Sequence, residues 1–74
     1  MNITEEKRWL WRLDQARELA DADSCRTILQ LFDGQLNEEL KEWLQGNIEA
    51  RVAQADKAQQ HIEKLTARMI EEMK

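Results

Sequence analysis

The sequence contains one histidine, His61, and one cysteine, Cys25, and these are its first candidates for chemistry. A thiol–imidazole couple needs its two side chains within hydrogen-bond reach. The two residues lie on separate helical stretches, and the pairing of these stretches described below places them near opposite ends of the molecule. We therefore expect Cys25 to be a small core residue and His61 to be an exposed helix position.

Other patterns typical of catalysis or metal binding are missing from the sequence. The 74 residues show no Cys/His spacing of a zinc site, no glycine-rich phosphate loop and no nucleophile elbow. The carboxylate pairs Glu38–Glu39 and Glu71–Glu72 are adjacent in sequence, so their side chains point to different sides of a helix. We expect no catalytic activity, no cofactor, no metal ion and no small-molecule substrate.

Length and composition favour a single helical domain over residues 1–74. Hydrophobic residues make up 42% and charged residues 35% of the chain, with two Gly and no Pro, as in a soluble helical protein. A net charge of −4 argues against direct nucleic-acid binding. No apolar run is long enough to span a membrane, and charges interrupt any export signal in residues 1–15. A single cysteine excludes an internal disulfide, so we expect a cytoplasmic protein.

The stretch from Asn37 to Lys74 predicts one long helix, about residues 38–73. It is rich in strong helix formers, contains no Pro and has Gly46 as its only glycine. Its apolar residues recur in steps of three and four, which is the period of a helix: Leu40, Leu44, Ile48, Val52, Ala55, Ala58, Ile62, Leu65, Met69 and Met73. Such a helix is a rod of about 57 Å whose apolar side must be covered by the rest of the chain.

Residues 4–32 predict either one bent helix or two helices. Asn2 followed by Glu5 has the spacing of a helix N-cap, so the first helix should begin near residue 3 or 4. The stripe Trp9, Leu13, Ala16, Ala20 is followed by a rotated stripe, Cys25, Ile28, Leu29, Phe32. Asp and Ser favour helix caps. We therefore favour a break at residues 21–24, giving helices at about 4–20 and 24–32, over a single bent helix.

The dipeptide Asp33-Gly34 predicts the main turn of the chain. We expect Gly34 to supply the left-handed residue after a helix and Asn37 to cap the long helix. A connection of about four residues makes the flanking helices antiparallel. The expected fold is all-α with a helix content above about 75%: an antiparallel helical hairpin or a three-helix arrangement. Counting back from the turn, Cys25 faces residues 41–44, and residues 9–13 face residues 55–60.

Surplus apolar side chains point to protein contact as the function. Successive helical residues are about 100° apart, so three in a row cannot share one stripe. We expect Trp11 to be partly exposed and Trp43 to be buried near Cys25. Exposed Trp is enriched at protein interfaces. The other residues expected at a partner or dimer interface lie at the end of the long helix, beyond the reach of the first helix: Leu65, Met69, Ile70 and Met73.

The chain from Leu36 onward resembles the small subunit of bacterial exonuclease VII, which is a short acidic helical hairpin. The matching residues are Ile28, Leu31, Gly34, Leu36, Glu39, Leu40, Trp43, Gly46, Ala50, Arg51, Gln54 and Ala55. The resemblance covers less than half of the chain, and the region around Trp9, Trp11 and Cys25 has no counterpart. It implies an accessory subunit without an active site of its own.

Two functions are therefore expected from the sequence. The first is a small non-catalytic interaction module of bacterial or phage type, an adaptor, chaperone or inhibitor that presents a helical face to a partner protein. The alternative is an accessory subunit or co-regulator of a nucleic-acid-processing complex, which reaches DNA only through its partner. The partner is a different protein or a second copy, with the long helices paired about a two-fold axis.

Overall fold

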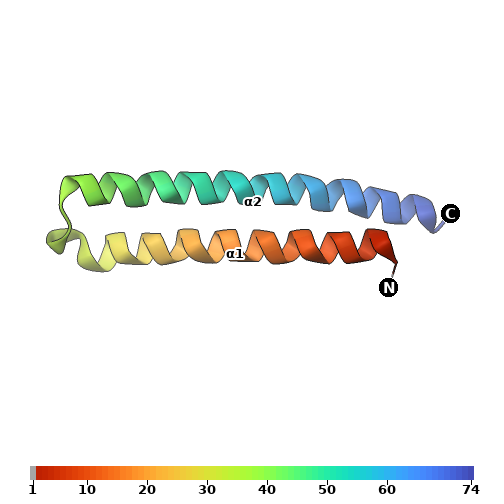
Figure 1. Cartoon of the computed structure of the whole chain (residues 1–74), viewed down its shortest axis with the longest axis horizontal. Helices are drawn as coiled ribbons and strands as arrows, with labels where there is room; N and C mark the ends of the chain where they lie inside the picture. Colours follow the sequence, from red (N-terminus) through yellow and green to blue (C-terminus); the bar gives the residue numbers. More distant parts are fainter. Residues whose placement is uncertain (1) are drawn as a thin grey trace.

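The computed structural model describes residues 2–74, which form one helical hairpin (Figure 1). Helix α1 (Ile3–Phe32) is followed by a 3-10 turn, η1 (Asp33–Gln35), and by helix α2 (Glu38–Glu72). The helices run antiparallel along a rod of 57 × 16 × 14 Å, with both termini at one end. With 93% of the structure helical, the predicted all-α hairpin is confirmed. Neither helix combines the length and the apolarity that crossing a membrane requires.

Both helices begin at the asparagines that the sequence indicates. The Asn2 side-chain oxygen accepts a hydrogen bond from the Glu5 N–H at 2.8 Å, and Asn37 does the same for the Leu40 N–H at 2.8 Å. Each cap satisfies an N–H group that has no partner inside the helix. These local contacts fix the start of α1 at residue 3 and of α2 at residue 38.

Helix α1 is continuous through residues 21–24, so the predicted break is wrong and the three-helix arrangement is not found. The Ser24 hydroxyl donates to the Ala20 carbonyl at 3.0 Å, a bond that a helical Ser makes without interrupting the helix. The Asp21 carboxylate pairs with Arg51 of α2 at 2.7 Å instead of capping a new helix. With neither Gly nor Pro between residues 3 and 32, nothing else ends α1 early.

The chain reverses through η1 without a left-handed residue. No glycine in residues 2–74 has a positive φ, so the role predicted for Gly34 is wrong. The Leu36 N–H donates to the Asp33 carbonyl at 3.3 Å, and Leu36 itself is extended. The Lys41 ammonium pairs with the Asp33 carboxylate at 3.1 Å and ties the turn to the first turns of α2.

A seam of alternating three- and four-residue steps joins the helices, as in a two-stranded coiled coil. On α1 the buried or half-buried residues of the seam are Thr4, Arg8, Trp11, Gln15, Glu18, Ala22, Cys25 and Leu29. On α2 they are Lys41, Leu44, Ile48, Arg51, Ala55, Ala58, Ile62, Leu65 and Met69. Among these residues the large apolar side chains that are buried are Leu44, Ile48 and Ile62. The core of the hairpin is therefore narrow.

Side-chain hydrogen bonds between the helices mark the register along the rod. Donor and acceptor residues are Asn47 and Cys25 (3.2 Å), Gln15 and Gln59 (2.7 Å), and Thr4 and Glu72 (2.8 Å). Cys25 thus shares a core cluster with Leu44, at the end of the predicted range 41–44, and its hydrogen bond to Asn47 lies just beyond that range, because η1 continues the coil of α1 before the chain reverses. Since α1 reaches Glu72, the prediction that it runs out opposite Leu65 is wrong.

Candidate interaction surface

Over residues 4–20, helix α1 turns toward α2 the side that was expected to face solvent, whereas Cys25 is buried against α2 as predicted. The predicted inward stripe, Trp9, Leu13, Ala16 and Ala20, is exposed at all four positions. Ala22 and Cys25 pack on Leu44 and Ile48 of α2, and this core cluster fixes the rotation of α1. Because α1 is continuous, the same rotation holds back to its first turn. Of the rotated stripe that suggested a break, Cys25 and Leu29 lie in the seam while Ile28 and Phe32 are exposed, and the earlier stripe faces outward.

The exposed large apolar side chains of α1 form a surface that we call the outer α1 face. Its members are Ile3, Trp9, Leu10, Leu13, Ile28, Leu31 and Phe32, which are 38% to 69% exposed. Leu19 is also exposed, but it lies about 120° round the helix from Leu13 and is not part of this face. Single exposed apolar residues are normal on proteins, whereas a continuous apolar patch marks an interaction site. The face consists of one cluster at residues 3–13 and another at residues 28–32.

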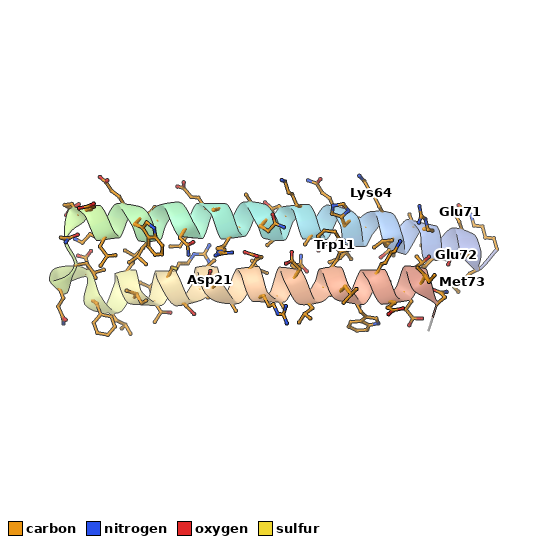
Figure 2. All side chains as sticks on the ribbon, viewed as in Figure 1. Trp11, Asp21, Lys64, Glu71, Glu72 and Met73 are labelled. Atoms are coloured by element: carbon orange, nitrogen blue, oxygen red, sulfur yellow. The ribbon has the colours of Figure 1, made fainter. Side chains whose placement is uncertain are left out.

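The three tryptophans lie in different environments, and two predictions about them need correction. Trp43 is 63% exposed, so its predicted burial near Cys25 is wrong: it precedes the seam residue Leu44 and points about 100° away from it. Trp11 is half-buried and stacks on the His61 ring, with centroids 4.1 Å apart and an angle of 7° between the planes. Figure 2 shows Trp11 on the side of α1 that faces α2.

Trp9, on the outer α1 face, combines an exposed ring with a nearby cation. Its ring is half exposed and lies 4.8 Å from the Arg12 guanidinium carbon, within the range of a cation–π contact. Trp and Arg are the residue types most enriched at binding hot spots. This interface role was expected for Trp11, but Trp9 is the more exposed tryptophan of α1.

The residues predicted as an interface at the end of α2 divide into two pairs. Leu65 and Met69 are half-buried in the seam, where Arg8 donates to the neighbouring Thr66 hydroxyl at 3.3 Å. Ile70 and Met73 are 53% and 85% exposed, and Figure 2 shows Met73 at the open end of the rod. The last turns of α2 therefore have an intramolecular partner, and only Ile70 and Met73 are freely accessible.

Polar groups occupy the part of the seam that lies behind the outer α1 face. Arg51 donates to Glu18 at 3.1 Å and pairs with Asp21 at 2.7 Å, and the hydrogen bond that Arg51 donates to Glu18 raises the pKa of Arg51 above its ordinary value. The Glu18 side chain is only 13% exposed. Burial of such groups lowers stability unless their hydrogen bonds are complete.

Two further polar atoms in this region are buried without a hydrogen-bond partner, the Arg8 Nε and an Asp14 carboxylate oxygen. An unsatisfied buried polar group costs about 1–3 kcal/mol of stability. The side of α1 that meets α2 is thus polar where the opposite side is apolar. A single hairpin thus leaves polar atoms without partners on the inner side of α1 and apolar side chains exposed on its outer side.

Two open grooves follow the exposed apolar residues. One, of about 360 Å³, is lined by Lys7, Leu10, Trp11 and Asp14 of α1. The other, of about 370 Å³, is lined by Asn37, Glu39, Leu40 and Trp43, where α2 begins. Each groove runs along a single helix, whereas small-molecule sites are usually enclosed clefts. These grooves can instead take side chains from another helix.

The residues first considered for chemistry are kept apart. The buried Cys25 thiol accepts a hydrogen bond from the Asn47 amide at 3.2 Å, and His61 is exposed except for its contact with Trp11. Within residues 2–74 no three His, Cys, Asp or Glu side chains lie close enough together to hold a metal ion. Cys25 and His61 are thus on contacts of their own, at different levels of the hairpin.

Comparison of the chain with known proteins gives no match to a protein family, to a curated protein or to a solved structure. The likeness to the exonuclease VII small subunit stays an expectation drawn from the residues named above.

Proposed function

We propose that the protein is a small interaction module that binds a partner protein through the outer α1 face and has no catalytic role. The observation that supports this proposal is the mismatch between the two sides of α1. Leu10 and Leu13 point to solvent, whereas Arg8, Gln15 and Glu18 point to α2. Burying apolar surface is worth about 25 cal/mol per Å², so a hairpin that acts alone gains by turning its apolar side inward.

The binding mode that fits this surface is helix against helix. Leu10 and Leu13 are three residues apart, and Trp9 and Arg12 lie beside them on the same stretch. An amphipathic partner helix docks on anchors at such spacing. The partner would contribute its own apolar stripe, and the charged residues along α1 would form the rim of the interface.

The alternative function, an accessory subunit of a nucleic-acid-processing complex, would use the same face. With a net charge of −4 the chain is unsuited to bind nucleic acid itself, so that contact would belong to the partner. Cys25, the single cysteine, is buried and free, which fits a reducing compartment such as the cytoplasm. The identity of the partner separates this function from that of an adaptor, chaperone or inhibitor.

The test is affinity capture of the tagged chain in cells that produce it naturally, followed by mass spectrometry. We expect a protein that is retained by the wild type and lost with Leu10→Glu/Leu13→Glu. The matched control is Ala53→Glu, an exposed position on α2, which should retain it. Circular dichroism checks that all three proteins keep their helix content. A partner held equally by every variant would show that binding does not use the outer α1 face.

A further inference from the structure

We infer that the outer α1 face binds a second copy of this chain, with the two α1 helices antiparallel across a two-fold axis. This inference rests on the proposed function and identifies the partner protein as a second copy. Four helices would then lie side by side, with both α1 helices inside. The sequence analysis placed a dimer at the end of α2. Leu65 and Met69 are already engaged with α1, so α1 is the helix that still lacks a cover.

The residue pattern along α1 suits an interface with a two-fold axis near its middle. Apolar clusters at residues 3–13 and 28–32 flank a middle stretch with small residues, Ala16, Ala20 and Ser24. In a two-fold interface residue i contacts residue j, and j of the first copy contacts i of the second. With the two-fold axis near residue 22, antiparallel pairing therefore brings the cluster at residues 28–32 of each copy onto residues 12–16 of the other copy, where the cluster at residues 3–13 ends.

Helix geometry gives this pairing a register. Leu13 and Leu31 are five helical turns apart and so lie on one line along α1, with Ala20 and Ser24 between them. A two-fold axis at the level of residue 22 places Leu13 opposite Leu31 of the second copy and Ala20 opposite Ser24. The small side chains at the axis allow the helices to approach to about 8–10 Å.

The distribution of charge favours antiparallel over parallel pairing. Residues 21–50, the half of the rod at the turn, contain seven acidic and two basic residues, a net charge of −5. Residues 2–20 and 51–74, the open half, contain eight acidic and nine basic residues, a net charge of +1. Parallel pairing would put the two acidic halves together. Antiparallel pairing places each acidic half beside the weakly positive half of the other copy, which lowers the repulsion.

The acidic residues nearest the proposed axis already have cationic partners in their own chain. Asp21 is paired with Arg51 at 2.7 Å, and Asp23 with Arg26 at 2.9 Å. The approach of a second copy at this level thus brings together neutralised pairs, which repel each other less than bare carboxylates.

The surface area of the hairpin is also large enough for such an interface. Its accessible surface is 5621 Å², whereas a compact monomer of 8.8 kDa exposes roughly 4,800 Å². The difference, roughly 800 Å², is about what each partner loses in a protein–protein interface of standard size. A second copy on α1 would bring the surface per chain to that of a compact protein.

Sedimentation equilibrium at tens of micromolar tests the inference. We expect the wild type to have twice the 8.8 kDa mass of the chain. Leu13→Glu and Leu31→Lys should each give the monomer mass. An equimolar mixture of the two variants should restore the dimer. In the antiparallel pair the new carboxylate faces the new ammonium, and the other Leu13–Leu31 contact is intact.

A second mixture separates the two orientations. Leu13→Glu mixed with Leu31→Glu should stay monomeric in the antiparallel arrangement, because two carboxylates then meet. In a parallel dimer residue 13 faces residue 13, so both mixtures would behave alike, and that result would overturn the orientation. Ala53→Glu is the control and should leave the dimer intact, while circular dichroism shows whether each variant remains helical.

A wild-type mass of 8.8 kDa would overturn the second copy as partner. The proposed function would survive that result if cell capture still depended on Leu10 and Leu13, so the two failures are distinguishable. A dimer that neither Leu13→Glu nor Leu31→Lys weakens would overturn the assignment of the face. A monomer that sediments with phosphatidylcholine–phosphatidylglycerol vesicles would assign the face to a membrane surface and overturn the inference as well.

Discussion

Trp11 and Trp43 show how burial decides the contribution of a large side chain. Trp11 is half-buried and stacked on His61, and an aromatic pair contributes about 0.5–1.5 kcal/mol beyond its buried area. Trp43 is 63% exposed. We expect Trp11→Ala to lower the free energy of unfolding by about 1–2 kcal/mol and Trp43→Ala to change it by less than about 0.5 kcal/mol. Urea unfolding followed by circular dichroism measures both, and the reverse order would contradict the rotation of both helices.

Lys41 makes the turn sensitive to alkaline pH. The hydrogen bond from Lys41 to Asp33 raises the pKa of this lysine above its ordinary 10.5. A pKa that is raised by folding adds stability below the unfolded value, and this stability is lost as the pH rises through the folded value. The thermal unfolding midpoint should therefore decrease as the pH rises beyond 10.5. The decrease should be smaller in Lys41→Met. Lys57→Met, at an exposed position on the same helix, is the control. An equal fall in both variants would show that Asp33 and Lys41 do not stabilise the turn.

At the scale of the helices, Gly46 is a weak point inside α2. It is exposed, and a Cβ at this position would meet nothing within 4 Å. A glycine inside a helix is less favourable than alanine by roughly 0.5–1 kcal/mol. We expect Gly46→Ala to raise the free energy of unfolding by about that amount, measured by urea unfolding. A loss of stability would indicate that another chain approaches α2 closely at this position.

The parts of the fold that depend on local chemistry could be predicted from the sequence. Asn2 and Asn37 each accept from an N–H three residues later, which short-range spacing is enough to specify. The length of α2 follows from the three- and four-residue spacing of its apolar residues over 35 residues without a proline. Asp21 and Ser24 were ambiguous, because the same side chains serve as caps or as helix-surface groups, and the long-range partner Arg51 decided between these roles.

The candidate surface could not be derived from periodicity alone, since α1 has two apolar stripes and only one can meet α2. The spacing Trp9, Leu13, Ala16, Ala20 is a good helix stripe but contains no information about what covers it. The signal that identifies the side facing α2 is the spacing of Ala22, Cys25 and Leu29. The same three- and four-residue steps extend toward the N-terminus through Glu18. A pair of stripes on one unbroken helix indicates two different partners, and here one of them is α2.

At the scale of the whole molecule, the hairpin has little to hold it together by itself. Its buried large apolar residues are Leu44, Ile48 and Ile62, and a domain of this length is near the size at which a single core is marginal. The buried atoms of Arg8 and Asp14 without partners lower its stability further. The proposed pairing of α1 helices would add apolar burial on the side of the rod that has none.

If a second copy stabilises the fold, the thermal stability of the protein must depend on its concentration. Dissociation is coupled to unfolding in such a dimer, so a tenfold rise in concentration adds about 1.4 kcal/mol per dimer to the apparent stability. With an unfolding entropy of about 2.1 cal/mol/K per residue, two chains should show a rise in Tm of roughly 4–5 °C. We expect calorimetry to find this rise for the wild type and for Ala53→Glu, and none for Leu13→Glu. A wild-type Tm that stays constant over a hundredfold range of concentration would mean that each hairpin unfolds alone.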